Sequence, residues 1–90
     1  MQSIVLTVNH PVGLHARPAA QFVQIASQFE SEITVANKTK ESNPVNAKSI
    51  LSVLTLGVHK GYEIEIFADG ADESEALKAI EQLVADNFGE

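Results

Sequence analysis

Apolar and polar residues alternate in short segments spread along the sequence, and a period of two is typical of strands that bury one face. The alternation is clearest in YEIEIFAD, where Ile64 and Ile66 are expected to point inward. A shorter segment, PVNA, begins with a proline, which suits an edge strand or the first residue of a strand. The predicted strands are residues 3–9, 31–37, 44–47 and 62–69. The other side chains expected on their inner face are Ile4, Leu6, Val8, Ile33 and Val35.

Between these strands, apolar residues recur at helical spacing. The spacing predicts a first helix over residues 16–29, and Pro18 fits its first turn because the first N–H groups of a helix have no helical acceptor. The apolar stripe of this helix comprises Ala19, Phe22, Val23, Ala26 and Phe29. A second, short helix is expected between Ser49 as the N-cap and Gly57 as a stop. Its expected core residues are Ile50, Val53 and Leu56.

The last helix is expected to begin at Asp72 and Glu75, which have the spacing of a capping box, although that motif favours Ser or Thr. Its apolar stripe comprises Ala76, Leu77, Ile80, Leu83, Val84 and Phe88. Because each strand has one polar face, this order of elements predicts an α+β fold in which helices cover one face of a mostly antiparallel sheet. Ninety residues suit one domain, residues 1–90, because a second core would not fit.

The composition excludes several classes of protein. The chain has no cysteine, so a disulfide framework and a thiolate metal site are impossible. The first residues, MQSIVLTVNH, have neither a basic start nor a long apolar run, so we expect no signal peptide, no membrane span and a cytoplasmic protein. The net charge of −6 divides into +2 over residues 1–60 and −8 over residues 61–90. Nucleic-acid binding is not expected, because it would require clustered basic residues.

The stretch VGLHARPAAQ holds the candidate site. His15 carries an imidazole, which is a good nucleophile when neutral, and it directly precedes the first predicted helix. The backbone N–H groups of Ala16 and Arg17 would form an anion site there, and the Arg17 guanidinium suits phosphoryl oxygens. The combination favours transient phosphorylation of His15. A surface His–Arg pair that merely ends a loop explains these residues equally well when they are taken alone.

The other histidines and the acidic residues indicate no further chemistry. His10 and His59 stand beside loop residues and are expected to be exposed polar side chains without a role. No spacing of histidines and carboxylates indicates a metal site, and no cofactor is expected. The chain also has no Gly-rich phosphate loop, and the nearest acids, Glu30 and Glu32, are too far along the sequence for contact to be assumed. A phosphorylated histidine without such machinery describes a carrier rather than a self-sufficient enzyme.

Two motifs, GLHARPAA and VNAKSILSVLTLGVHKG, resemble the HPr family, the histidine-containing phosphocarriers of the bacterial phosphoenolpyruvate-dependent sugar phosphotransferase system. The resemblance covers nearly the whole chain and includes GADESEALKAIEQLV near its end. It implies an open-faced β-sandwich, in which two long helices and one short helix cover one side of a four-stranded antiparallel sheet. We also expect a monomer.

The resemblance further implies roles for individual residues. His15 falls on the position whose Nδ1 accepts the phosphoryl group from phosphorylated enzyme I and passes it to enzyme IIA domains for sugar uptake. Arg17 falls on the arginine that steadies this group. Ser49 falls on the regulatory serine that an HPr kinase/phosphorylase modifies, and a transcriptional regulator is a further expected partner. Leu51 and Leu54 fall on exposed apolar positions that dock partners.

Physical arguments bear on these implied roles. Leu51 and Leu54 lie at a different angle of the short helix from its core residues, so they form either a docking surface or a cover for the sheet edge. Basic side chains at Arg17 and Lys48 would steer acidic partners. Ser49 is first of all an N-cap, and a phosphate there suits the helix but adds negative charge to the docking surface.

Three departures from the family pattern concern the choice of partner more than the chemistry. Val12 replaces a small polar residue, so its side chain offers the phosphoryl group no hydrogen bond. The loop NKTKESNP is longer than in common relatives, and Ser52 stands where glycine is frequent. Two other functions stay open: a regulatory binding module with little part in sugar uptake, and a paralogue dedicated to nitrogen regulation or to one substrate. The intact His15 argues against the first.

Overall fold

The expected strands and helices all form, in the expected order, in a computed structural model that describes residues 1–89. They are β1 (Gln2–Thr7), α1 (Ala16–Ala26), β2 (Glu32–Asn37), β3 (Val45–Asn46), α2 (Ile50–Leu54), β4 (Glu63–Asp69) and α3 (Glu73–Ala85), followed by a 3-10 turn, η1 (Asn87–Gly89). The predicted α+β class is therefore confirmed. Within the described part of the chain, no helix has the length and apolar character that a bilayer crossing needs.

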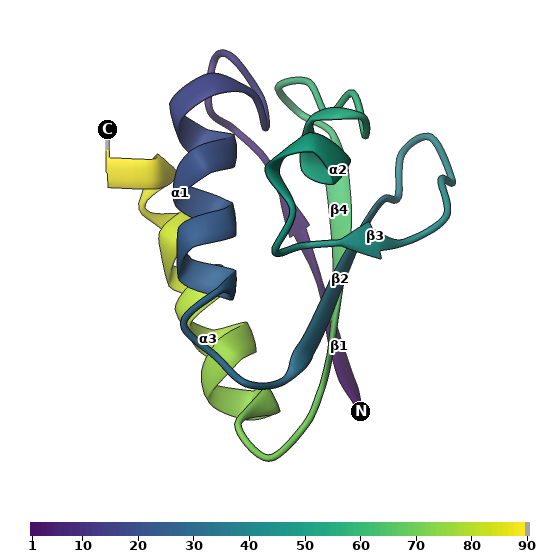
Figure 1. Cartoon of the computed structure of the whole chain (residues 1–90). Helices are drawn as coiled ribbons and strands as arrows, with labels where there is room; N and C mark the ends of the chain where they lie inside the picture. The colour runs from purple at the N-terminus through teal and green to yellow at the C-terminus, as the bar shows by residue number, and fades with distance from the viewer. Residues whose placement is uncertain (90) are drawn as a thin grey trace.

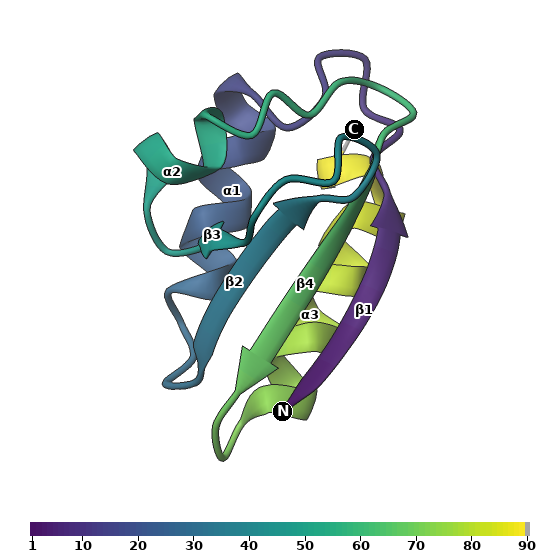
Figure 2. The same cartoon turned by 90° about the vertical axis from the view of Figure 1, so that its right-hand side faces the viewer.

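The strands form one antiparallel sheet in the order β1-β4-β2-β3 (Figure 2). β4 lies between β1 and β2, and its Ile66 stands directly opposite Ile4 on one side and Val35 on the other. Directly opposed residues share a face of the sheet. This register therefore collects the apolar side chains of three strands on one face, as the alternation in the sequence predicts.

The helices cover that apolar face, and the other face of the sheet is open (Figure 1). α1 and α3 contact each other, and α2 contacts α1 and β3. The shared core includes Phe22 of α1 and Ile80 of α3, both fully buried, and Phe88, which is 1% exposed. Burial of each such side chain contributes about 1.5 to 3 kcal/mol. The helical stripes are confirmed, although Val23, Phe29 and Leu83 are only partly buried.

Two details of α1 and α2 differ from the prediction. α1 ends at Ala26, before residue 29, because the N–H groups of Gln28 and Phe29 bond to carbonyls three residues back and so tighten the chain into a turn. Ile50 was expected in the core and is 40% exposed, whereas Val53 is fully buried. A helix of one and a half turns can bury only one narrow face, which explains the difference.

The predicted capping box of α3 is wrong. Asp72 is the N-cap residue, but its side chain makes no capping hydrogen bond. Its carboxylate instead accepts hydrogen bonds from the backbone N–H groups of Glu30, at 2.9 Å, and Ser31, at 3.0 Å, and from the Ser31 hydroxyl. These bonds, that of the Ser31 hydroxyl first, hold the pKa of Asp72 below its usual value. The start of α3 is thus tied to the loop that follows α1.

Candidate functional site

His15 lies where three segments meet at one end of the molecule. It is the N-cap residue of α1, with extended backbone angles of φ −131° and ψ 168°, and its side chain makes no capping hydrogen bond. In Figure 2 the loop before α1, the loop before β4 and α2 lie together at this end. The imidazole is half-buried, and the side chains of Ala16 and Arg17 beside it are exposed. The phosphoacceptor candidate is therefore accessible from solvent.

The loop that carries His15 is held by its backbone. The N–H of Gly13 donates to the carbonyl of His10 at 2.8 Å, and the N–H of Leu14 donates to the carbonyl of Val58 at 3.0 Å. Gly13 has a φ of +69°, and a Cβ there would lie 2.2 Å from the Val58 carbonyl oxygen. Leu14 is fully buried, so the residue before His15 is anchored in the core.

The start of α1 offers donors to an anion. The first N–H groups of a helix have no acceptor within the helix, and the helix dipole favours negative charge at this end. α1 has no acidic residue in its first turn that would occupy this position. Ala16 has a φ of +52°, a left-handed conformation that costs a non-glycine residue about 1 to 2 kcal/mol. Backbone strain therefore sits directly after His15.

Arg17 is the cation nearest to His15 in the sequence, and its side chain is exposed. The ion pairs seen among residues 1–89 join Met1, Asp69 and Glu73 at one place and Lys38 and Glu65 at another, and none involves Arg17. The planar guanidinium suits two oxygens of one phosphoryl group. Arg17 thus presents an exposed guanidinium that pairs with no carboxylate of residues 1–89.

His59 lies against His15, a contact that the sequence does not indicate. The centroids of the two imidazole rings are 5.6 Å apart, and the rings are tilted by 42°. The ring of His59 also packs against Tyr62 in a T-shaped arrangement, with ring centroids 5.2 Å apart. The predicted exposure of His59 is confirmed. Because the two histidines belong to different loops, only the folded sheet brings them together, and no local pattern could have revealed the pair.

The predicted exposure of His10 is wrong. Its side chain is 5% exposed, and its Nδ1 accepts a hydrogen bond from the backbone N–H of Val12 at 3.2 Å. The ring also meets Phe88 edge-on at 6.0 Å. The loop before α1 packs against the buried Phe88 beyond α3. His10 is therefore buried between this loop and Phe88, although it is a polar residue. Val12 itself is 48% exposed.

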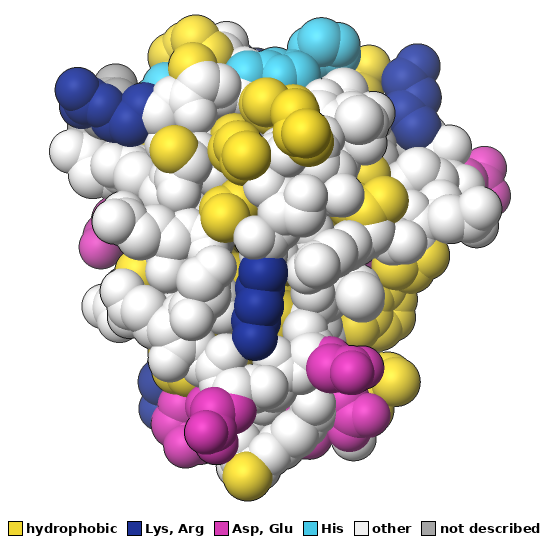
Figure 3. All heavy atoms as spheres, viewed as in Figure 1, with side chains coloured by type: hydrophobic (Ala, Val, Ile, Leu, Met, Phe, Trp, Pro, Cys, Tyr) yellow, Lys and Arg dark blue, Asp and Glu magenta, His cyan; other side chains and the backbone are white. Residues whose placement is uncertain are grey.

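Exposed apolar side chains stand at the same end as the histidines. Leu51 is 74% exposed and Leu54 is 37% exposed, which disfavours the alternative that they only cover the sheet edge. Figure 3 shows apolar side chains gathered just below the histidines on this side of the molecule. A shallow groove of about 420 Å³ adjoins them, lined by Ala20, Val23, Gln24 and Ile50.

Ser49 and Lys48 precede α2 but face different surroundings. The predicted N-cap is confirmed, because the Ser49 hydroxyl accepts a hydrogen bond from the backbone N–H of Ser52 at 3.3 Å. The Lys48 amine donates to the carbonyl of Phe29 at 2.7 Å, in the loop after α1. A helix of 11 residues is about 16 Å long. The amine therefore lies near the end of α1 opposite to His15, and its steering role stays a prediction.

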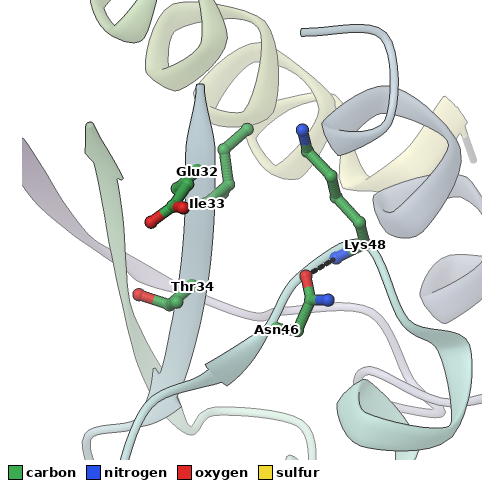
Figure 4. Close-up of a pocket in the computed structure, with 5 residues that line it drawn as sticks. All are labelled: Glu32, Ile33, Thr34, Asn46 and Lys48. Carbon is green, nitrogen blue, oxygen red and sulfur yellow. Dashed lines mark hydrogen bonds between the residues drawn. The ribbon is translucent and has the colours of Figure 1, made fainter. Parts of the chain in front are cut away.

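A second hollow lies away from His15, at the edge where β3 ends. It has a volume of about 270 Å³, and Glu32, Ile33, Thr34, Asn46 and Lys48 line it (Figure 4). Asn46 accepts a hydrogen bond from the backbone N–H of Lys48 at 2.9 Å, which turns the chain out of the strand. Across residues 1–89, no three His, Asp or Glu side chains are grouped so that they could hold a metal ion.

Comparison with known families and proteins agrees with this geometry. Residues 2–86 match a family described as the PTS HPr component phosphorylation site. The chain is 45% identical over 85 residues to the phosphocarrier protein HPr of Neisseria meningitidis serogroup A, covering 94% of this chain and 92% of that protein. It is 42% identical over 88 residues to the multiphosphoryl transfer protein of Escherichia coli O157:H7, covering 98% of this chain but only 23% of that longer protein.

Solved structures show the same fold. A crystal structure of HPr from Thermoanaerobacter tengcongensis superposes with a TM-score of 0.94 at 46% identity, covering 100% of this chain and 98% of that chain. A crystal structure of HPr from Bacillus anthracis gives a TM-score of 0.85 at 37% identity, covering 92% and 95% of the two chains. The open-faced sandwich implied by the sequence motifs is therefore confirmed.

Proposed function

This chain belongs to the HPr family of phosphocarrier proteins of the phosphotransferase system, and we propose that it carries its phosphoryl group on His15. Members of this family are relay carriers rather than enzymes. The observation that carries the assignment is the position of His15. Its imidazole is accessible, and it lies at the start of α1, whose first turn has no acidic residue. Arg17, which pairs with no carboxylate of the described residues, supports it.

The geometry suits a simple displacement. The lone pair of the His15 Nδ1 attacks phosphorus on the donor, a new N–P bond forms, and the bond between phosphorus and the donor's leaving atom breaks with its electrons remaining on that atom. The N–H groups of Ala16 and Arg17 and the Arg17 guanidinium then bind the phosphoryl oxygens. The reverse displacement delivers the group to the acceptor. The chain supplies the relay point, and its partners supply the remaining catalytic groups.

The partners in this proposal are enzyme I as donor and enzyme IIA domains as acceptors, and the relay operates in the cytoplasm with the chain as a monomer. Leu51 and Leu54, exposed on α2 at the same end as His15, would dock both partners. A small exposed apolar surface suits brief and weak association with several proteins. Arg17 would meet acidic groups that surround the partner's own phosphorylated residue.

The test of the relay is phosphorylation from phosphoenolpyruvate with catalytic enzyme I. We expect the wild-type chain to gain one acid-labile phosphoryl group, detected by intact mass, and peptide mapping to locate it on His15 rather than on His10 or His59. His15→Ala should gain none while keeping the wild-type circular dichroism spectrum. Phosphorylation of folded His15→Ala to the wild-type extent would refute the assignment.

We further propose that phosphorylation of Ser49 by an HPr kinase/phosphorylase reduces phosphoryl transfer. The hydroxyl caps α2, where a phosphate suits the helix dipole, so the harm would fall on docking near Leu51 and not on the fold. Ser49→Asp should therefore fold normally and accept phosphate from enzyme I several-fold more slowly than wild type. Ser49→Asn is the matched control, because asparagine caps as well without a charge. Equal rates for the two variants would contradict the proposal.

A further inference from the structure

Backbone contacts hold the loop of His59 beside the loop of His15. The carbonyl of Val58 accepts a hydrogen bond from the N–H of Leu14 at 3.0 Å, so the two residues before the histidines are joined. Gly13 packs so closely here that a Cβ on it would lie 2.8 Å from the Cα of His59. These backbone contacts bring the two residues together, and the centroids of their imidazole rings lie 5.6 Å apart.

Tyr62 also contacts His59, through its backbone and through its ring. The N–H of Tyr62 donates to the carbonyl of His59 at 3.0 Å, which closes a turn, and the Tyr62 ring meets His59 edge-on at 5.2 Å. The Lys40 amine lies 5.8 Å from the centre of the Tyr62 ring. Lys60 is the neighbouring residue in the chain and is exposed. The titratable groups next to His59 are thus His15, Tyr62 and Lys60, with Lys40 next to Tyr62, and among residues 1–89 His59 forms no ion pair with a carboxylate.

The electrostatic interaction between His59 and His15 differs between the unmodified and the phosphorylated chain. In the unmodified chain, protons on both imidazoles would place two like charges side by side, which is unfavourable. A phosphoryl group on His15 brings negative charge and strong acceptor oxygens into the same space. A protonated His59 would then face an anion instead of a cation. The interaction is therefore favourable only in the phosphorylated state, as a ligand of the carried group requires.

We propose that His59 is a second ligand of the phosphoryl group, donating a ring N–H to its oxygens when the imidazole is protonated. This inference rests on the proposed phosphorylation of His15. It assigns a role to a residue for which the sequence indicates none, and it makes retention of the phosphoryl group depend on pH. A protonated imidazole is a cation and a neutral one is not, so the contribution should be larger at pH 6 than at pH 8.

The experiment is a competition for one pool of phosphoryl groups. Wild-type chain and His59→Gln are mixed in equal amounts with catalytic enzyme I and a limiting amount of phosphoenolpyruvate, and intact mass gives the phosphorylated fraction of each at equilibrium. Because both proteins carry the same His15, the ratio isolates the contribution of residue 59. We expect wild type to hold about three- to tenfold more phosphate at pH 6, since a charge-assisted hydrogen bond at an exposed site is worth roughly that. The ratio should be smaller at pH 8.

Two further variants separate charge from packing. His59→Lys keeps a positive charge at both pH values and should outcompete His59→Gln at pH 6 and at pH 8 alike. Lys60→Gln removes the neighbouring charge without touching the ring pair and should match wild type at both pH values. An advantage of wild type over His59→Gln that does not change with pH would mean that the ring acts by packing alone and would overturn the proposal.

The remaining outcomes are also decisive. Equal partition between wild type and His59→Gln at both pH values means that His59 does not bind the phosphoryl group. If Lys60→Gln lowers the phosphorylated fraction as much as His59→Gln does, the positive charge of the whole loop favours the phosphoryl group, and His59 is not a direct ligand. That result would overturn the assignment to His59. If neither protein is phosphorylated on His15, the proposed function itself fails and the inference fails with it. This result differs from one in which both proteins are phosphorylated to the same extent.

Discussion

Gly13 and Gly57 have nearly the same backbone conformation, with φ of +69° and +63°, but different surroundings. A Cβ on Gly13 would lie 2.2 Å from the carbonyl oxygen of Val58, whereas a Cβ on Gly57 would have no heavy atom within 4 Å. The same substitution thus tests two effects. At Gly57 it measures the conformation alone, and at Gly13 it adds the contact that holds the His15 loop against the loop before β4.

We predict that Gly13→Ala lowers the free energy of unfolding by about 2 to 4 kcal/mol, from the left-handed conformation and the forced displacement of backbone together. Gly57→Ala should cost about 1 kcal/mol or less, because the loss of freedom in the unfolded chain offsets part of the conformational cost. Urea unfolding of both variants measures the difference. Equal losses of unfolding free energy in the two variants would show that the backbone around Gly13 can accommodate a Cβ without a measurable energetic penalty.

The place of the candidate site at the start of α1 could be predicted from the sequence, but its surroundings could not. His15, Ala16 and Arg17 are neighbours in the chain, so a local pattern carries the expectation of an anion site at a helix start. His59 and His10 depend on contacts between distant segments. His59 reaches His15 only through the pairing of two loops, and His10 is buried by Phe88 from beyond α3. Histidine is intermediate between the buried and the exposed residue types, so residue type alone predicts neither contact.

At the scale of the elements, hydrophobic periodicity was sufficient to predict the order of strands and helices, and the ends were less predictable. The apolar stripe of α1 extends to Phe29, yet the helix ends at Ala26, because Phe29 packs on the core from a turn. The spacing of Asp72 and Glu75 suggests a cap, yet the loop after α1 takes the Asp72 carboxylate. In both cases the side chain that the local pattern assigns to the helix makes a tertiary contact instead: Phe29 with the core, and Asp72 with the loop after α1.

α2 is the element whose stability depends most on a single side chain. It has five residues, and a helix of that length is marginal without packing or a cap. We predict that Ser49→Ala lowers the free energy of unfolding by about 0.5 to 1 kcal/mol, at the lower end of cap effects because the hydrogen bond to the Ser52 N–H is long, at 3.3 Å. Ser52→Ala, the same change inside the helix, should be neutral or slightly stabilising, since alanine is the better helix former. Thermal unfolding of the pair checks this, and equal losses would show that the Ser49 hydroxyl does not act as a cap.

At the scale of the whole molecule, the two ends have different character. Histidines and exposed apolar side chains gather at the end where α1 begins, and acidic side chains gather at the opposite end (Figure 3). The opposite end is where the loop after α1 meets the start of α3, through Asp72, Glu30 and Ser31. Gly70 lies so close there that a Cβ on it would be 2.5 Å from the Ser31 hydroxyl oxygen. This junction thus joins α3 to the loop after α1, and the phosphoryl chemistry is proposed for the other end.

This separation predicts an acid-dependent stability that leaves the relay untouched. The pKa of Asp72 is lowered in the folded chain, chiefly by the Ser31 hydroxyl and then by the Glu30 N–H, from a reference value of 3.8. The ionised carboxylate therefore stabilises the folded state above pH 3.8, and the contribution is lost as the pH falls through the lower folded value. Asp72→Asn should be less stable than wild type at neutral pH, and the difference should shrink as the pH falls through the lowered pKa of Asp72. Phosphorylation of His15 by enzyme I at neutral pH should proceed equally in both.

Urea unfolding of wild type and Asp72→Asn from pH 2 to pH 7 measures this effect, with Glu81→Gln as the control for loss of one exposed carboxylate on α3. The control should follow wild type closely, because an exposed charge contributes little by itself. A difference between wild type and Asp72→Asn that stays constant down to pH 2 would mean that the ionised carboxylate is not the stabilising form. A slower phosphorylation of Asp72→Asn would mean that the two ends are coupled. Since the junction and His15 lie at opposite ends of α1, and no described interaction joins Asp72 to the loop of His15, we expect neither result.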